Sequence, residues 1–120
     1  MARINKDRPE EHAKRWGAEL WVENCPEYCG KILHFLKAHS GTSLHFHSKK
    51  LETMFLSAGI LQVELIDPET AERYEVVLHP GDNIQIPRNQ PHRLNPLLDD
   101  TVLIEFSTHH EDSDSYRVIR

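Results

Sequence analysis

Two histidines, His45 and His47, stand one residue apart in the segment HFHSKKLETMF, and Glu52 follows five residues after the second. In a β-strand, residues two apart point to the same side, so the two imidazoles can share one metal ion. The intervening SKKL is long enough to turn a corner and begin a neighbouring strand, which would bring the carboxylate beside the imidazoles. Two nitrogens and one oxygen suit a divalent cation of the first transition row.

A fourth candidate ligand, His92, lies in the second half of the chain, in the segment HPGDNIQIPRNQPHRLN. This segment contains a Pro-Gly-Asp turn and a short expected strand that ends at Pro87. His92 then follows a tight turn at the start of a new strand. A fourth protein ligand would still leave coordination positions open for water or substrate.

The elements that must position these residues are short β-strands. From Trp16 onward, runs rich in Val, Ile, Leu, Phe and Tyr are separated every eight to twelve residues by turn-forming sequences, and no helical periodicity connects them. This spacing is typical of an all-β sandwich or barrel. The expected strands are residues 18–24, 30–38, 43–47, 51–58, 60–67, 73–79, 83–87, 91–95 and 101–107.

Length and charge limit the domain count and the partners. The 120 residues are expected to form one domain at 16–120, preceded by a charged arm at 1–15 that is loose or forms a short helix. The formal charge of −5 and the absence of a basic block argue against nucleic acid and anionic membranes as partners. No apolar run has the length of a membrane span, and the first residues lack the apolar core of a signal peptide, so a cytoplasmic protein is expected.

The two histidine-bearing segments resemble the two sequence motifs of the cupin superfamily. The first motif reads Gly41, His45-Phe46-His47, four residues, Glu52, six residues and Gly59, and the second reads Gly81, five residues, Pro87 and then His92. There are three departures from the family pattern, all expected to affect the shape of turns. Gly41 stands two residues nearer the histidine pair, Asn89 replaces a common glycine, and Asn95 falls one place short of the family asparagine.

The resemblance implies a fold and a metal site. Cupins are jelly-roll barrels, also described as double-stranded β-helices, with a cavity that can enclose a metal and a small ligand. One divalent transition metal (Mn, Fe, Ni, Co or Zn) would be bound by His45, His47, Glu52 and His92. The resemblance also implies a homodimer, in which strands around ELWVEN would add to the partner's sheet and cover an exposed edge.

Longer stretches across residues 16–118 resemble the cupin domain of mannose-6-phosphate isomerases and stand-alone cupins of sugar metabolism. They imply a sugar-like small-molecule ligand and an isomerase or epimerase activity. Two alternatives stay open: an iron- or nickel-dependent dioxygenase, and a non-catalytic module that binds a sugar through the metal.

Isomerisation needs a base beyond the metal ligands. Glu105 lies in the otherwise apolar run TVLIEFS and would serve if its face points into the barrel; the alternative is a solvated glutamate on the outer face. Five other charged residues could pair with phosphate or hydroxyls but are interpreted as surface charges: Lys31, Lys50, Arg93, His110 and Arg117.

Overall fold

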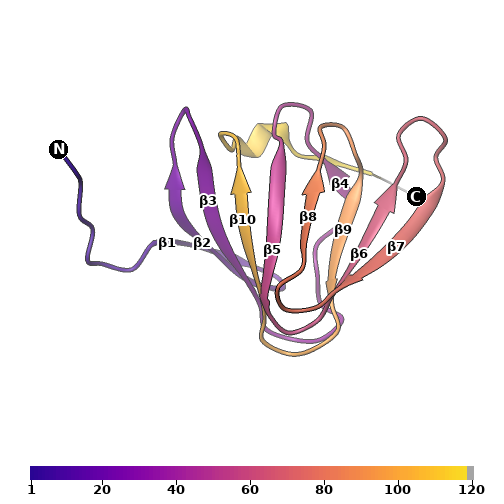
Figure 1. Ribbon diagram of the computed structural model, residues 1–120, viewed down its shortest axis with the longest axis horizontal. Helices are drawn as coiled ribbons and strands as arrows, with labels where there is room; N and C mark the ends of the chain where they lie inside the picture. Colours follow the sequence, from indigo (N-terminus) through magenta and orange to yellow (C-terminus); the bar gives the residue numbers. More distant parts are fainter. Residues whose placement is uncertain (119–120) are drawn as a thin grey trace.

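The computed structural model describes residues 1–118, whose strands form two antiparallel sheets facing each other (Figure 1). The six-stranded sheet has the order β1 (Glu10–Lys14), β2 (Gly17–Asn24), β3 (Cys29–Phe35), β10 (Thr101–Ser107), β5 (Glu52–Ala58) and β8 (Asn83–Ile86). The five-stranded sheet has the order β11 (Tyr116–Arg117), β4 (His45–Phe46), β9 (His92–Pro96), β6 (Leu61–Ile66) and β7 (Arg73–Leu78). A 3₁₀ helix, η1 (Asp112–Asp114), precedes β11. Across residues 1–118, no helix has the length and apolar character needed to cross a membrane.

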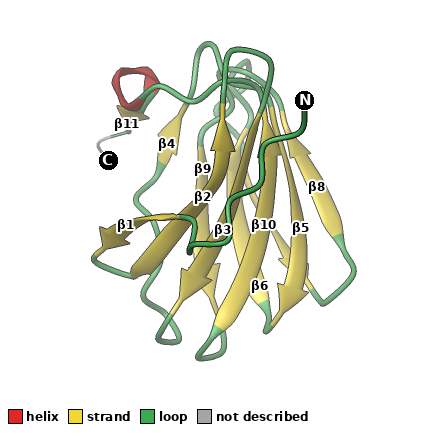
Figure 2. Cartoon of the chain, turned by 90° about the vertical axis from the view of Figure 1, so that its left-hand side faces the viewer, coloured by secondary structure: helices red, strands yellow, loops and turns green. Residues whose placement is uncertain are grey.

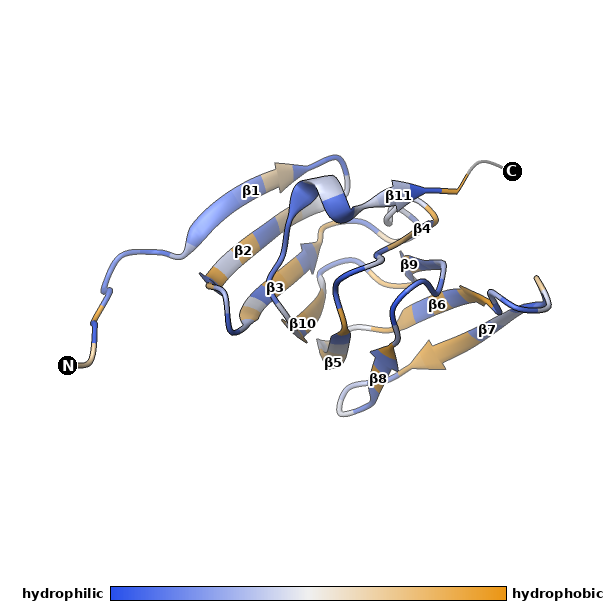
Figure 3. Cartoon of the chain, turned by 90° about the horizontal axis from the view of Figure 1, so that it is seen from above, coloured by the Kyte–Doolittle hydropathy of each residue, from blue (hydrophilic) through white to orange (hydrophobic). Residues whose placement is uncertain are grey.

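The core lies between the two sheets, because alternate residues of each strand turn their apolar side chains inward. In β6, Leu61, Val63 and Leu65 are buried while the residues between them are only partly covered. Phe35 from β3 and Leu103 from β10 meet them from the opposite sheet, and both are fully buried. Seen from above, strands such as β2 show hydrophobic and hydrophilic positions alternating along their length (Figure 3). The all-β jelly-roll fold predicted from the sequence is confirmed.

The charged N-terminal arm contains a strand where a loose arm or a short helix was expected. Residues 10–14 form β1, which pairs with β2, while the residues before it extend away from the barrel (Figure 1). The ring of His12 stacks on Trp21 with centroids 3.8 Å apart, which ties the strand to its neighbour. Because β1 covers β2, the ELWVEN strand is not the edge of its sheet, and the homodimer remains a prediction.

Two turns need particular residues, one at the end of β5 away from Glu52 and one beside His47. Gly59, between β5 and β6, has a φ of 85°, and a side chain there would meet Thr101 Oγ1 at 2.2 Å. Asn89, which replaces the family glycine, has a φ of 68°, a region that asparagine tolerates better than most residues. Its N–H donates to the carbonyl of His47 over 2.7 Å. Of the three departures from the family pattern, Asn95 lies within β9 and not in a turn as expected.

Candidate metal centre

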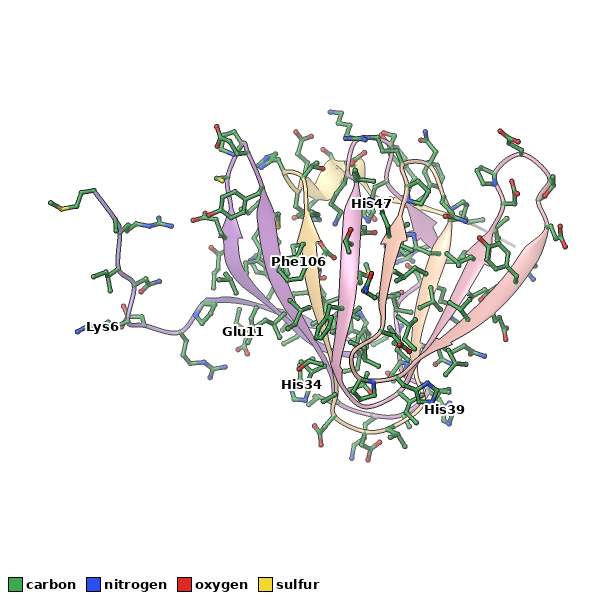
Figure 4. All side chains as sticks on the ribbon, in the orientation of Figure 1. Lys6, Glu11, His34, His39, His47 and Phe106 are labelled. Atoms are coloured by element: carbon green, nitrogen blue, oxygen red, sulfur yellow. The ribbon has the colours of Figure 1, made fainter. Side chains whose placement is uncertain are left out.

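Three imidazoles converge at one end of the barrel. His45 on β4 stands directly opposite His92 on β9, so both side chains lie on the same face of the sheet. His47 follows β4 on that face, and one ring nitrogen of each histidine lies within 4.8 Å of the other two. In Figure 4, His47 lies at the end of the barrel that carries η1, whereas His34 and His39 lie towards the opposite end.

Backbone carbonyls fix the protonation of all three rings. Nδ1 of His45 donates to the carbonyl of Ser43 over 2.8 Å, and Nδ1 of His92 donates to that of Gln90 over 3.0 Å. Nδ1 of His47 donates to the carbonyl of Asp114 over 2.9 Å. A carbonyl only accepts, so Nδ1 carries the proton in each ring and the Nε2 lone pair is free to coordinate. This arrangement orients imidazoles in metal sites generally.

Glu52, at the start of β5, adds a carboxylate to the cluster. Its Oε1 lies 3.0 Å from Nε2 of His92 and 3.9 Å from Nε2 of His47. Both oxygens of Glu52 and Nε2 of His92 are buried without a hydrogen-bond partner among the described residues. With the proton of His92 on Nδ1, Oε1 and Nε2 face each other as two lone pairs, which is unfavourable unless a cation lies between them.

Protonation could place a positive charge between Glu52 and the imidazoles on one ring only, that of His92. The Glu52 carboxylate outweighs the effect of burial and raises the pKa of His92, which favours a proton there. Burial, with the neighbouring His92, lowers the pKa of His45 to about 4, and burial also lowers that of His47, so both are neutral at pH 7. Neutral imidazoles and an ionised carboxylate are the forms that bind metals. The donor set therefore fits a divalent transition metal.

Glu105 and Lys50 form a buried pair beside this cluster. Lys50 Nζ lies 3.2 Å from Glu105 Oε2, 3.4 Å from Glu52 Oε2 and 3.2 Å from Nδ1 of His110. Burial opposes the charge on Lys50, but the two carboxylates raise its pKa above the usual range. Burial and the charge of Glu52 raise the pKa of Glu105. Glu105 thus faces inward, as its proposed role as base requires.

A second buried lysine lies on β3, the strand next to that of Glu105. Lys31 on β3 is 2% exposed, and its Nζ lies 3.1 Å from Glu19 Oε1 and 4.5 Å from the centre of the Trp21 ring. The interpretation of Lys31 and Lys50 as surface charges was therefore wrong. Both lysines are buried, because Glu19 on the neighbouring strand β2 compensates Lys31 and Glu105 on β10 compensates Lys50. Arg93, by contrast, lines a separate cavity whose other residues come from β6, β7 and β9, away from the cluster.

Asp114, in η1, holds the loop that carries the candidate ligands. Its buried carboxylate accepts hydrogen bonds from the backbone N–H groups of Ser48, Lys49 and Lys50, at 3.0 to 3.1 Å, and from the hydroxyl of Ser48 at 2.9 Å. The backbone carbonyl of Asp114 accepts a hydrogen bond from Nδ1 of His47. The sequence contains no indication of this role, because Asp114 stands in an acidic stretch that is typical of a solvent-exposed segment.

Replacing Asp114 by alanine should loosen this loop. Three buried or half-buried amides would lose their acceptor, and each unsatisfied group of this kind costs about 1–3 kcal/mol. The amides of residues 48–50 should exchange with deuterium about tenfold faster or more, as measured by hydrogen-exchange mass spectrometry. The matched control is Asp112→Ala, which removes an 83% exposed carboxylate two residues away. Equal exchange in the two variants would contradict a positioning role for Asp114.

The clustered groups line one cavity of about 440 Å³ between the sheets. Its volume falls within the roughly 300–1,000 Å³ of typical small-molecule sites. The four candidate ligands line this cavity, and so do the buried side chains of Lys31, Lys50 and Glu105. The carboxyl group of Glu105 therefore faces the same space as the candidate ligands.

Comparison with known proteins identifies the architecture. A family model described as a cupin domain matches residues 32–105. No curated protein sequence matches the chain. Among solved structures, the capsular polysaccharide assembling protein CapF from Staphylococcus aureus superposes with a TM-score of 0.81 at 17% identity, over 92% of this chain and 34% of CapF. This chain thus spans about a third of CapF.

Two other solved structures share the fold. KdgF from Halomonas sp. has a TM-score of 0.66 at 21% identity, covering 80% of this chain and 81% of KdgF. Oxalate decarboxylase from Bacillus subtilis has a TM-score of 0.80 at 12% identity, covering 98% of this chain and 33% of the enzyme. At these identities the likeness establishes the fold.

Proposed function

This chain belongs to the cupin domain family, and on that premise we propose that it binds one divalent transition metal and isomerises or epimerises a sugar or sugar phosphate. His45, His47, Glu52 and His92 would bind the metal. Manganese, iron, nickel, cobalt and zinc all accept this mixture of nitrogen and oxygen ligands.

One arrangement carries the proposal: the buried Oε1 of Glu52 and Nε2 of His92 lie 3.0 Å apart beside two further imidazoles that are neutral at pH 7. These two imidazoles direct Nε2 to the same place, because their Nδ1 protons are donated to carbonyls. A single divalent cation satisfies all these groups at once, whereas a proton satisfies one pair.

The other residues of the cavity suit proton transfer on a sugar. When bound, a divalent metal would act as a Lewis acid and lower the cost of negative charge on a carbonyl oxygen. Glu105 lines the same cavity, and we assign it the role of the base that moves a proton between neighbouring carbons. Lys50 stands between Glu52 and Glu105 and holds the Glu105 carboxylate in place through its Oε2.

The test combines metal content with anaerobic turnover. The purified protein is loaded separately with each of the five metals, desalted and measured by inductively coupled plasma mass spectrometry. The manganese form is then incubated without oxygen, in D₂O, with aldose and ketose hexoses and their 6-phosphates. An isomerase is expected to interconvert them and to introduce deuterium at the carbon next to the carbonyl.

Other outcomes would replace the proposal. Oxygen uptake by the iron or nickel form would indicate a dioxygenase. A sugar-dependent rise in melting temperature without turnover would indicate a binding module. No metal after loading would contradict both kinds of metalloenzyme.

A further inference from the structure

The exposed charged residues that line the rim of the cavity are mostly basic: Lys14, Arg15 and Arg117, with Asp112 as the acidic one. The three basic residues lie on or next to two edge strands, β1 and β11, on the same side of the barrel (Figures 2 and 3). Lys14 ends β1 and Arg15 follows it, at the edge of the six-stranded sheet. Arg117 belongs to β11, at the edge of the five-stranded sheet. A ligand that enters between the sheets must pass these side chains.

Three of the four carboxylates that line the cavity, Glu19, Glu52 and Glu105, lie beside a buried lysine. Lys31 pairs with Glu19, which Lys14 also approaches at 3.8 Å, and Lys50 pairs with Glu105. Nearer the rim, Asp112 lies 2.8 Å from Nε2 of His110. Burial lowers the pKa of His110 to about 4, so His110 is neutral at pH 7 and leaves the charge of Asp112 in place. No ion pair joins Asp112 to Arg15 or Arg117 within residues 1–118.

The two arginines lack an acidic partner within residues 1–118. Arg15 donates from Nη2 to the carbonyl of Gly41 over 2.7 Å, a neutral acceptor that fixes its position and leaves its charge uncompensated. The side chain of Arg117 has no hydrogen bond or ion pair within the described part of the chain. An unpaired guanidinium is a planar fork of donors suited to carboxylate and phosphate.

The strand register directs one of these groups toward the metal cluster. Arg117 is the direct partner of His45 in the β11–β4 ladder. Residues directly opposite in an antiparallel pair have side chains on the same face, so Arg117 shares the face from which His45 reaches the cluster. The next N–H along, that of Val118, donates to the carbonyl of Leu44 and holds β11 in this register.

We propose that Arg15 and Arg117 form an anion subsite at the rim, so that the ligand carries a phosphate or carboxylate at one end and a metal-binding sugar carbonyl or hydroxyls at the other. This inference rests on the proposed function for the metal end of the ligand. The subsite itself uses neither the metal nor its ligands. It selects an anionic sugar over the neutral sugar of the same shape.

Isothermal titration calorimetry on the full chain tests the subsite. The probes are mannose 6-phosphate against mannose, glucuronate against glucose, and inorganic phosphate alone. The anionic member of at least one pair should bind about tenfold tighter or more, and Arg117→Gln or Arg15→Gln should remove most of that preference. The phosphate and carboxylate arms show which anion the subsite takes. The matched control is Arg93→Gln, since Arg93 lines a different cavity.

Two results would overturn the subsite: equal binding of both members in each pair, or variants of Arg15 and Arg117 that bind like the Arg93 variant. Metal content, measured on the same samples, separates this failure from failure of the proposed function. A protein without metal that binds inorganic phosphate through Arg117 keeps the subsite and loses the metalloenzyme. A metal-loaded protein that isomerises neutral sugars as well as charged ones keeps the enzyme and loses the subsite.

Discussion

Replacing His92 by alanine should reduce bound metal from about one ion per chain to background. The His92 side chain is 1% exposed, and its Nε2 has no other hydrogen-bond partner among the described residues, so water cannot readily replace it. The loss should also appear in stability. Metal at a hundred times its dissociation constant stabilises a folded protein by about 2.7 kcal/mol, and the variant should lose this gain. Metal content by mass spectrometry and urea unfolding with and without manganese measure both effects.

The matched control is His79→Ala, because His79 is an exposed histidine outside the cluster. It should bind as much metal as the wild type and show the same manganese-dependent stabilisation. His45→Ala provides a second test if the His92 variant folds poorly, and circular dichroism establishes that each variant is folded. Full metal content in a folded His92 or His45 variant would contradict the ligand assignment.

Most strands of the barrel follow from local patterns, whereas β1 and β11, each at one edge of a sheet, do not. The run ILQVELID alternates so regularly that β6 and its buried face could be predicted from sequence alone. The sequence EEHAK of β1 is charged and lacks this alternation, and it forms a strand because β2 offers an edge and Trp21 stacks on His12. β11 has only two residues, and its place depends on pairing with β4. β2 follows β1 closely in the sequence, but nothing in EEHAK marks that segment as a strand, whereas β4 lies far from β11 in the sequence.

The candidate ligands on the first motif could be recognised because their spacing is local, whereas the groups packed around them could not. His45 and His47 stand two residues apart on one short segment, so the sequence alone predicts that their side chains lie on the same face of a strand. No sequence pattern marks Lys50 as buried, and lysine side chains are usually exposed to solvent. It is buried because Glu105, 55 residues away, supplies the opposite charge. Asp114 likewise acts 64 to 66 residues from the loop it holds.

The sequence left open whether Glu105 points into the barrel or outwards. Replacing Glu105 by glutamine is expected to have the second large effect. The strand β10 lies between β3 and β5, and its register pairs Glu105 with Lys31 on one side and Met54 on the other, both of which face inward. The amide of glutamine has nearly the same shape but cannot take up a proton. The rate of isomerisation should fall by about 10²- to 10⁴-fold, the range typical of a lost general base, while metal content stays unchanged.

The measurement is deuterium incorporation from D₂O into the sugar, followed beside metal content for the wild type and for Glu105→Gln. The control is Glu75→Gln, an exposed glutamate on β7 that binds Gln62 on the outer face. If the metal-loaded Glu105→Gln protein exchanges deuterium at the wild-type rate, Glu105 is not the base and serves only as the buried partner of Lys50. A variant that loses metal and exchange together would instead show that Glu105 acts through the cluster, because Lys50 then turns fully to Glu52 and competes with the cation for its oxygens.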